Sequence, residues 1–547
     1  METYRLALLI AFAFISLLLF QAWEHDYGTK PSTQSSQSIS QQGNDKGAAD
    51  IPQLSKGPDT AQTPVPTVAK TLATAQRVHV DTDLYDIVID TAGGDIREAK
   101  LKHYSVSVKE PDNKFELLND DPAHLFITQS GILGVNAPTH NKAKYQVDKS
   151  SYVMQNGDDT LKVVLNWQSQ NGISINKIYT FHRGSYVVDL DYQIMNNSNA
   201  AWTGRMYRQF KRIEVESSGG YQVRSFTGAV VSSPEKPYTK LSFSDMREHN
   251  LNETIQGGWT AMVQHYFLAA WLTDSKETSQ VYTKESDSNN FIIGMIAPKL
   301  DVEPGQNASM HGRLFLGPKL QDKLASIAPN LELSVDYGKL TIIAKPIYWL
   351  MERIHDVVNN WGWSIILLTL LIKLVFYKLS ETSYKSMANM RKLQPRLAKM
   401  KERFGDDKQA MQKAMMDLYK KEKINPLGGC FPILIQIPVF ISLYWVLIES
   451  VELRQADFIF WLKDLSSQDP YYVLPILNGI TMFLQQKLNP APMDPMQAKI
   501  MMMLPIVFTV FFLFFPSGLV LYWVTNNMLS MAQQWIITRR IEAGSKA

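Results

Sequence analysis

The chain contains 547 residues, of which 45% are hydrophobic and 20% are charged, and its formal net charge is +3. So small an excess of positive charge argues against DNA as a partner. The single cysteine, Cys430, excludes an intramolecular disulfide, and the sequence has neither a Cys/His cluster with metal-ligand spacing nor a phosphate-binding GxxxxGK(S/T) loop. We therefore expect no metal site and no cofactor. We also assign no catalytic residue and do not expect an enzyme.

The N-terminal region joins an apolar run to a polar stretch of low complexity. Leu6–Phe20 is almost unbroken in its hydrophobicity, and Gln21–Trp23 make a poor cleavage site, which favours a retained anchor over a removed signal peptide. Most residues from about 28 to 76 are Gln, Ser, Thr, Pro, Gly and Ala, too few of them apolar to offset the entropy lost on ordering. We predict a membrane anchor at 1–23 and a flexible linker at 24–76.

Alternation of apolar and polar residues dominates the next part of the chain. It is clearest in Tyr85–Ile89, Leu161–Trp167 and Val188–Ile194, with Gly, Asn and Asp between the runs. A period of two predicts antiparallel strands with one buried face, and its repetition predicts a large β-sandwich at 77–340. Leu320–Ala328 is the one short helix expected there.

After residue 340 the chain becomes apolar in long stretches. Ile347–His355 mixes aromatic and charged residues, which indicates either a helix at the membrane interface or a helix that closes the β domain. Five stretches near the roughly 20 residues that cross a bilayer follow. The predicted segments are an interfacial helix at 341–358, transmembrane helices at 359–380, 430–450, 471–487, 499–515 and 516–537, a cytoplasmic hairpin at 381–429, loops at 451–470 and 488–498, and a tail at 538–547. The predicted fold class is thus a multi-domain membrane protein, with five core transmembrane helices, an N-terminal anchor helix and an all-β domain.

Lysine and arginine near the apolar stretches set the predicted orientation. The segment Glu381–Gly429 is rich in both, whereas Glu449–Pro470 has only Arg454 and Lys463 among several acidic residues. Positive loops remain in the cytoplasm. We therefore expect both termini in the cytoplasm and the β domain in the periplasm of a Gram-negative cell, with the chain in the inner membrane as a multi-pass protein.

The basic segment has a helical period of its own. Its apolar residues recur at intervals of three and four and are interrupted at Gly405–Asp407, which predicts two antiparallel helices that end before Asn425–Pro426. The methionines of this hairpin either form its core or contact a client, and the candidates for capture are Met387, Met390, Met400, Met411 and Met415.

Lys373 is the most informative polar residue of the apolar stretches. A lysine at mid-depth costs about 2.5–3.5 kcal/mol on insertion scales unless water or a partner receives it. It either faces a water-filled groove or extends to the cytoplasmic headgroups, as Lys378 five residues later suggests. Because these stretches contain no Asp or Glu, a cation or proton relay is not indicated.

Seven motifs, in order, resemble the bacterial YidC/Oxa/Alb insertase family. They are Trp361–Ser364, Phe404–Asp407, Asn425–Pro432, Val451–Gln455, Asp469–Tyr472, Asp494–Gln497 and Phe515–Leu519. Gly257–Trp259 and Gln264–Phe267 resemble the Gram-negative form, so the resemblance covers nearly the whole chain. It implies a five-helix core with a cationic groove and a periplasmic β-super-sandwich similar to sugar-binding and mutarotase folds.

The resemblance also implies residue roles. Lys373 takes the groove position where the family typically has arginine, and Thr369 and Gln436 lie beside it. The positions along which a client slides are Ile437, Phe440, Phe511, Tyr522 and Trp523. Lysine lacks the bidentate fork of arginine, and Trp523 replaces a tyrosine, so hydrogen-bonding roles at these two positions do not carry over directly.

The predicted function is insertion and folding of integral membrane proteins, alone or with the Sec translocon. Expected partners are nascent membrane proteins, the Sec translocon, membrane lipids and the ribosome, which the basic hairpin and tail could contact. Two alternatives remain: a polytopic transporter or channel, and a membrane-tethered sugar-binding enzyme in which His265 is either catalytic or a buried structural residue.

Overall fold

The computed structural model describes residues 50–52, 72, 74–214, 225–287, 289–404, 407–422, 431–488 and 495–544. The predicted anchor at 1–23 lies outside the described residues, as does most of the predicted linker at 24–76.

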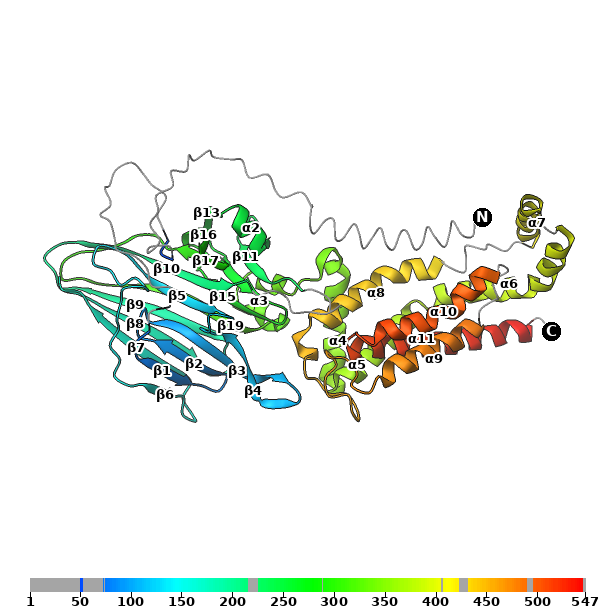
Figure 1. Ribbon diagram of the computed structural model, residues 1–547, viewed down its shortest axis with the longest axis horizontal. Helices are drawn as coiled ribbons and strands as arrows, with labels where there is room; N and C mark the ends of the chain where they lie inside the picture. Colours follow the sequence, from blue (N-terminus) through cyan, green and yellow to red (C-terminus); the bar gives the residue numbers. More distant parts are fainter. Residues whose placement is uncertain are drawn as a thin grey trace. The chain divides into compact units, whose positions relative to one another are not determined.

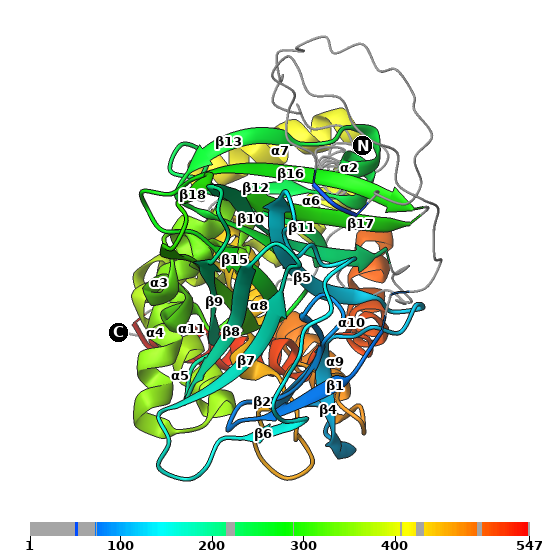
Figure 2. The same cartoon turned by 90° about the vertical axis from the view of Figure 1, so that its left-hand side faces the viewer.

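The strands form two sheets (Figures 1 and 2). The first sheet has eleven strands, in the order β13 (Asn252–Gln256), β16 (Thr278–Asp287), β17 (Asn290–Ile296), β10 (Trp202–Ile213), β5 (Phe126–Gly134), β3 (Asp95–Ser107), β2 (Tyr85–Asp90), β1 (Arg77–Asp81) and β6 (Ser151–Val153), with β18 (Leu300–Val302) beside β10 and β4 (Glu110–Leu118) beside β3. The second sheet has eight, in the order β12 (Thr239–Leu241), β11 (Gly228–Ser232), β14 (Trp259–Val263), β15 (Phe267–Leu272), β19 (Asn307–Pro318), β9 (Val187–Asn196), β8 (Ile173–His182) and β7 (Thr160–Gln168). Neighbouring strands are antiparallel, whereas β1 and β6 are parallel.

The two sheets pack face to face around a continuous core. In β9, alternate side chains from Val188 to Ile194 are fully buried, as the sequence pattern predicts. Hydrogen bonds also cross between the sheets: the Tyr85 hydroxyl of β2 donates to the Leu316 carbonyl of β19 at 2.5 Å. The predicted runs are confirmed as β2, β7 and β9, and the helix expected at 320–328 is α3 (Gln321–Ile327).

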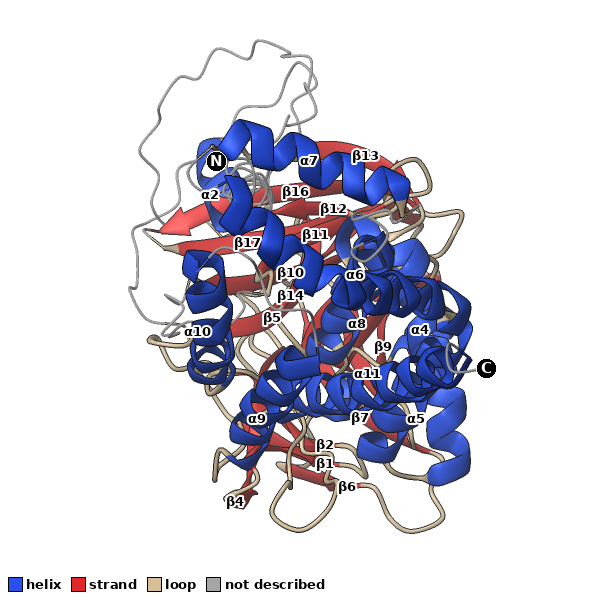
Figure 3. Ribbon diagram, turned by 90° about the vertical axis from the view of Figure 1, so that its right-hand side faces the viewer, coloured by secondary structure: helices blue, strands red, loops and turns tan. Residues whose placement is uncertain are grey.

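Helices dominate the rest of the described chain, apart from the loop between Glu449 and Val473 (Figure 3). After the short α2 (Phe243–Glu248) in the β domain, they are α4 (Thr341–Val358), α5 (Trp361–Val375), α6 (Tyr377–Phe404), α7 (Lys408–Lys421), α8 (Phe431–Glu449), α9 (Val473–Leu488), α10 (Pro495–Phe512) and α11 (Ser517–Gly544). Helix α11 is central, because it packs against α5, α6, α8 and α9. Helix α4 packs against α5 and α8, and α10 packs against α9.

The chain bends sharply between α5 and α6. Helix α5 begins where the Asn360 side chain accepts a hydrogen bond from the Trp363 amide, and it ends at Val375. Within the described part of the chain, no single helix is both long and apolar enough to span a membrane; Trp361–Val375 and Tyr377–Leu393 meet that test only as a pair bent by 68°. No proline or glycine marks the bend, so the sequence pattern did not reveal it.

Candidate functional site

Helices α5, α6, α8, α9, α10 and α11 line an open-sided cavity of about 410 Å³. We call it the Lys373 cavity. Its lining residues are Lys373, Ser380, Ser383, Tyr384, Met387, Gln436, Ile437, Phe440, Met482, Gln485, Gln486, Met501, Leu504, Pro505, Tyr522, Trp523, Asn526, Asn527 and Ser530. Polar residues therefore share one space with aromatic and aliphatic ones.

Lys373 turns into the helical bundle. Its side chain is only 4% exposed, and its Nζ atom donates to the Ser530 hydroxyl on α11 at 2.8 Å. The Ser530 hydroxyl donates in turn to the Asn526 carbonyl at 2.6 Å, which leaves a lone pair for the ammonium. Among the described residues no carboxylate lies within 4.0 Å of Nζ. The cavity wall thus holds a positive charge whose partner among the described residues is a neutral hydroxyl.

Amide and hydroxyl side chains connect α9 to α11 beside this lysine. Asn527 donates through Nδ2 to the Asn478 side-chain oxygen at 2.9 Å and lies 3.4 Å from the Thr481 hydroxyl. All three are buried. Such bonds bind helices together where water is scarce, so these residues fix the spacing of the two helices rather than offering free groups to a ligand.

Aromatic rings form another part of the cavity wall. The Phe440 ring lies 4.6 Å from the Trp523 ring and 5.8 Å from the Tyr522 ring, centroid to centroid. Phe512 continues this wall at 5.5 Å from Trp523, and Phe511 lies 5.7 Å from Phe512. Because Phe511 is 50% exposed, the row of rings leads from the cavity to the surface of the bundle.

The structure gathers most of the predicted groove and slide residues but separates two. Lys373, Gln436, Ile437, Phe440, Tyr522 and Trp523 all line the cavity. Thr369 does not: it is buried, and its hydroxyl donates to the Ile365 carbonyl of its own helix at 2.6 Å. Phe511 also lies outside the lining and reaches it only through Phe512.

Of the methionines predicted to capture a client, one lines the cavity and four do not. Met387, near the start of α6, lines the cavity. Met390 and Met400 lie further along α6, Met411 and Met415 lie on α7, and these four are partly buried. The hairpin of α6 and α7 therefore begins at the cavity wall.

Several lining residues were not among the predicted sites. Tyr384, Gln485 and Gln486 line the cavity, and the Tyr384 hydroxyl approaches the Ser530 carbonyl at 3.4 Å. The two glutamines are adjacent polar residues near the end of an apolar helix, which was a usable signal. Tyr384 had no such signal, because it falls in a helix of mixed polarity.

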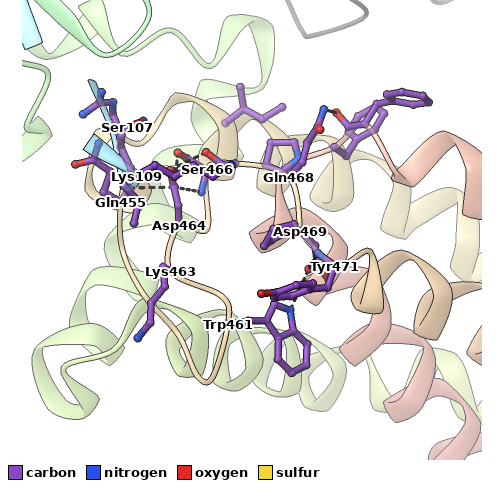
Figure 4. A pocket seen from close by; sticks show the side chains of 18 of the residues that line it. Ser107, Lys109, Gln455, Trp461, Lys463, Asp464, Ser466, Gln468, Asp469 and Tyr471 are labelled. Atoms are coloured by element: carbon purple, nitrogen blue, oxygen red, sulfur yellow. Dashed lines mark hydrogen bonds between the residues drawn. The ribbon is translucent and has the colours of Figure 1, made fainter. Parts of the chain in front are cut away.

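A larger cavity, of about 970 Å³, adjoins the segment from Gln455 to Tyr472 (Figure 4). Its polar side chains bond mainly to the segment itself: Asp464 accepts from the Gln455 and Ser466 amides, and Asp469 accepts from the Trp461 indole at 3.0 Å. Figure 4 shows Trp461, Asp469 and Tyr471 gathered on one side of this loop. The carboxylates are therefore used to shape the loop, which makes the Lys373 cavity the better candidate site.

His265 is a structural residue. Its Nε2 atom donates to the Ile448 carbonyl at 3.0 Å, and its ring stacks on Tyr266 with 3.9 Å between centroids. Burial lowers the pKa of His265 to about 4, so it is neutral at physiological pH. The ring is held by stacking and by a backbone carbonyl, and no carboxylate among the described residues bonds to it, which removes the main support for a sugar-converting enzyme.

These features define a protein with a two-sheet β domain and a helical bundle that lines an open-sided cationic cavity with an aromatic wall. Residues 77–350 match the family model of the YidC periplasmic domain, and residues 353–544 match that of the 60Kd inner membrane protein. The chain belongs to the YidC insertase family. It is therefore an inner-membrane protein with a periplasmic β domain, in a family of insertases rather than enzymes.

Relatives match over the full length. The membrane protein insertase YidC of Nitrosococcus oceani is 49% identical over 552 residues, covering 99% of each chain. That of Methylococcus capsulatus is 50% identical over 547 residues, again covering 99% of each. A crystal structure of an active YidC insertase with its first transmembrane domain resolved is 17% identical, covers 85% of this chain and 93% of its own, and has a TM-score of 0.40.

Proposed function

We propose that the protein inserts membrane proteins by receiving a polar flank of the client in the Lys373 cavity and passing its apolar segment along the aromatic wall into lipid. One observation carries this proposal: a buried ammonium, whose partner among the described residues is a hydroxyl, shares a cavity with Phe440, Tyr522 and Trp523. Neither ATP nor GTP is required in this mechanism.

The charge of Lys373 supports the polar half of the proposal. A buried cation without a carboxylate partner attracts acidic groups strongly, because the surrounding protein screens it less than water does. An acidic side chain of a client that enters the cavity would supply the missing partner. Gln436 offers an amide on the facing helix α8, which suits polar backbone groups of the same flank.

The exposed apolar residues support the other half. Ile437 of α8 is 41% exposed and Phe511 of α10 is 50% exposed. The ring of Phe440 on α8 contacts that of Trp523 on α11, which in turn contacts Phe512 on α10. A client segment in contact with them gains about 25 cal/mol for each Å² of apolar surface removed from water. Aromatic side chains adapt to many sequences because their contacts are non-directional, which suits a protein with varied clients.

We further propose the topology in which α5, α8, α9, α10 and α11 cross the inner membrane, joined by the anchor at 1–23. The α6–α7 hairpin and both termini are then cytoplasmic, because the hairpin carries most of the lysine and arginine near the bundle. In this arrangement the hairpin meets a nascent chain first, and its basic surface suits contact with the ribosome. Because the helices that border the cavity all belong to one chain, the protein can insert clients alone. This arrangement is also compatible with insertion beside the Sec translocon.

Site-specific photocrosslinking tests the route. A photoreactive amino acid at Ile437, Phe440 or Phe511 should crosslink to a stalled nascent membrane protein in native membranes. Ile476 on α9 is a matched control, because it is 53% exposed and does not line the Lys373 cavity. Crosslinks of equal yield from Ile476 and from the three test positions would contradict a defined route along α8 and α10.

A further inference from the structure

Residues 50–52, which belong to the predicted linker, lie on the first sheet of the β domain. The Asp50 carboxylate pairs with Lys211 of β10 at 2.7 Å and also accepts from the Ser286 hydroxyl of β16. The Asp50 carbonyl accepts from the Gln209 side chain at 2.9 Å, and Pro52 is buried. Asp50 is thus bonded, through both its carboxylate and its backbone carbonyl, to strands that lie far from it in the sequence.

The receiving surface is held by hydrogen bonds that do not involve Asp50. The side-chain oxygen of Gln209 accepts from the Tyr282 hydroxyl at 2.5 Å, and its Nε2 atom also donates to Gln129 at 3.0 Å. Gln209 is fully buried, so these bonds fix its amide with Nε2 facing Asp50. A side chain held in this way loses little further entropy on binding.

Lys211 makes the site selective for an anion. Its side chain is 7% exposed, and Asp50 is its ion-pair partner among the described residues. Without that carboxylate a buried ammonium would remain unpaired, which is strongly unfavourable. Burial raises the pKa of Asp50, but its attraction to Lys211 and the hydrogen bonds from Lys211 and Ser286 outweigh this, so the pKa lies below its ordinary value. Asp50 is therefore charged at physiological pH, and the contact does not act as a pH switch.

We propose that Gln209, Lys211 and Ser286 form a binding site for a carboxylate-bearing peptide, and that residues 50–52 occupy it as a latch on the linker. Closure of the latch shortens the stretch between the predicted anchor and the β domain from residues 24–76 to residues 24–49. Opening it restores the full reach. The latch thus sets how many residues separate the predicted anchor from the first contact with the β domain.

Disulfide trapping in the full-length protein tests the contact. In a Cys430→Ser background, Ile51→Cys with Ser286→Cys should form a disulfide in most molecules under mild oxidation, because Ile51 directly follows Asp50 and the Asp50 carboxylate that bonds Ser286 is kept. Ser309→Cys is the matched control, because Ser309 is exposed on β19 of the second sheet. A yield from Ser286→Cys no greater than from Ser309→Cys would overturn the latch.

Binding in trans tests the selectivity. A fluorescent peptide with the sequence of residues 46–56 should bind full-length Asp50→Ala protein, whose site is open, at least tenfold more tightly than it binds the wild-type protein, whose site is filled. The same peptide with asparagine at the Asp50 position should bind the Asp50→Ala protein at least tenfold more weakly. Equal binding of the two peptides would overturn recognition of a carboxylate. Loss of the difference in Lys211→Met, with circular dichroism unchanged, would assign the recognition to Lys211.

Discussion

Replacement of Lys373 by methionine removes the cavity's positive charge while keeping a side chain of similar length. A sphere of 410 Å³ has a radius of about 4.6 Å, so an acidic group inside the Lys373 cavity lies about 5–9 Å from Nζ. At 7 Å and an effective dielectric constant of about 20–40, the attraction amounts to about 1–2.5 kcal/mol. We expect insertion of a client with an acidic flank to fall roughly 7- to 60-fold in Lys373→Met.

The assay compares two clients in reconstituted vesicles, identical except that one has two aspartates in its translocated flank where the other has asparagines. Lys373→Met should affect the first client only, and Lys373→Glu should affect it more strongly because repulsion replaces attraction. Lys373→Arg should retain activity, since the charge remains. Lys378→Met is the control, because Lys378 is 92% exposed and lies one to two turns beyond Lys373.

Two results would contradict a role of the Lys373 charge in client recognition. If Lys373→Met and Lys373→Glu insert both clients as well as the wild type does, the cavity charge has no part in insertion. If both variants lose both clients equally, Lys373 serves the packing of α5 against α11 through its bond to Ser530, and not client recognition.

Three further predictions concern other parts of the chain. Phe440→Ala removes a ring that lies 4.6 Å from the Trp523 ring, and it should lower insertion of weakly hydrophobic clients about fivefold, for a loss of about 1 kcal/mol. Phe440→Leu should not lower insertion. Equal insertion by the two variants would exclude a role of the Phe440 side chain in client binding. Deletion of Met390–Lys421 with a short glycine-serine bridge should reduce crosslinking to nascent chains while the bundle still resists protease, and unchanged crosslinking would exclude capture by the hairpin. Burial lowers the pKa of Lys177 to about 7. Because the unfolded state then binds the extra proton between about pH 7 and 10.5, the β domain should become more stable as pH rises through that range, by up to about 1.4 kcal/mol per pH unit. Hydrogen exchange of β8 amides, corrected for intrinsic rates, should show this slope in the wild type and lose it in Lys177→Met.

Local sequence patterns were enough to predict the elements in which buried residues recur at a regular interval along the chain. Strand β9 has one face in the core, so its apolar residues recur every second position and are visible without any knowledge of its neighbours. Helix α4 has the bounds 341–358 expected from its amphipathic period. Lys373 was identifiable for a related reason: a single charge in an apolar helix is unusual whatever surrounds it.

Partners distant in sequence were not predictable in this way. Ser530, which accepts from Lys373, lies 157 residues away, and Asn478 bonds to Asn527 across 49 residues. Each is an ordinary polar residue in its own segment. Thr369 shows the opposite case, because its place one turn before Lys373 suggested a groove role, yet its hydroxyl bonds within its own helix.

The sequence by itself determined the order of the parts, the alternation that makes the two sheets, the apolar helices and the cation placed among them, since each of these depends on residues close together along the chain. Only the tertiary structure decided that Lys373 meets Ser530, that Phe440 meets Trp523, and that Asp50 leaves a polar linker to pair with Lys211. Those contacts arise when separate elements pack against one another, and their energy depends on the burial and orientation that packing creates, which no local pattern contains.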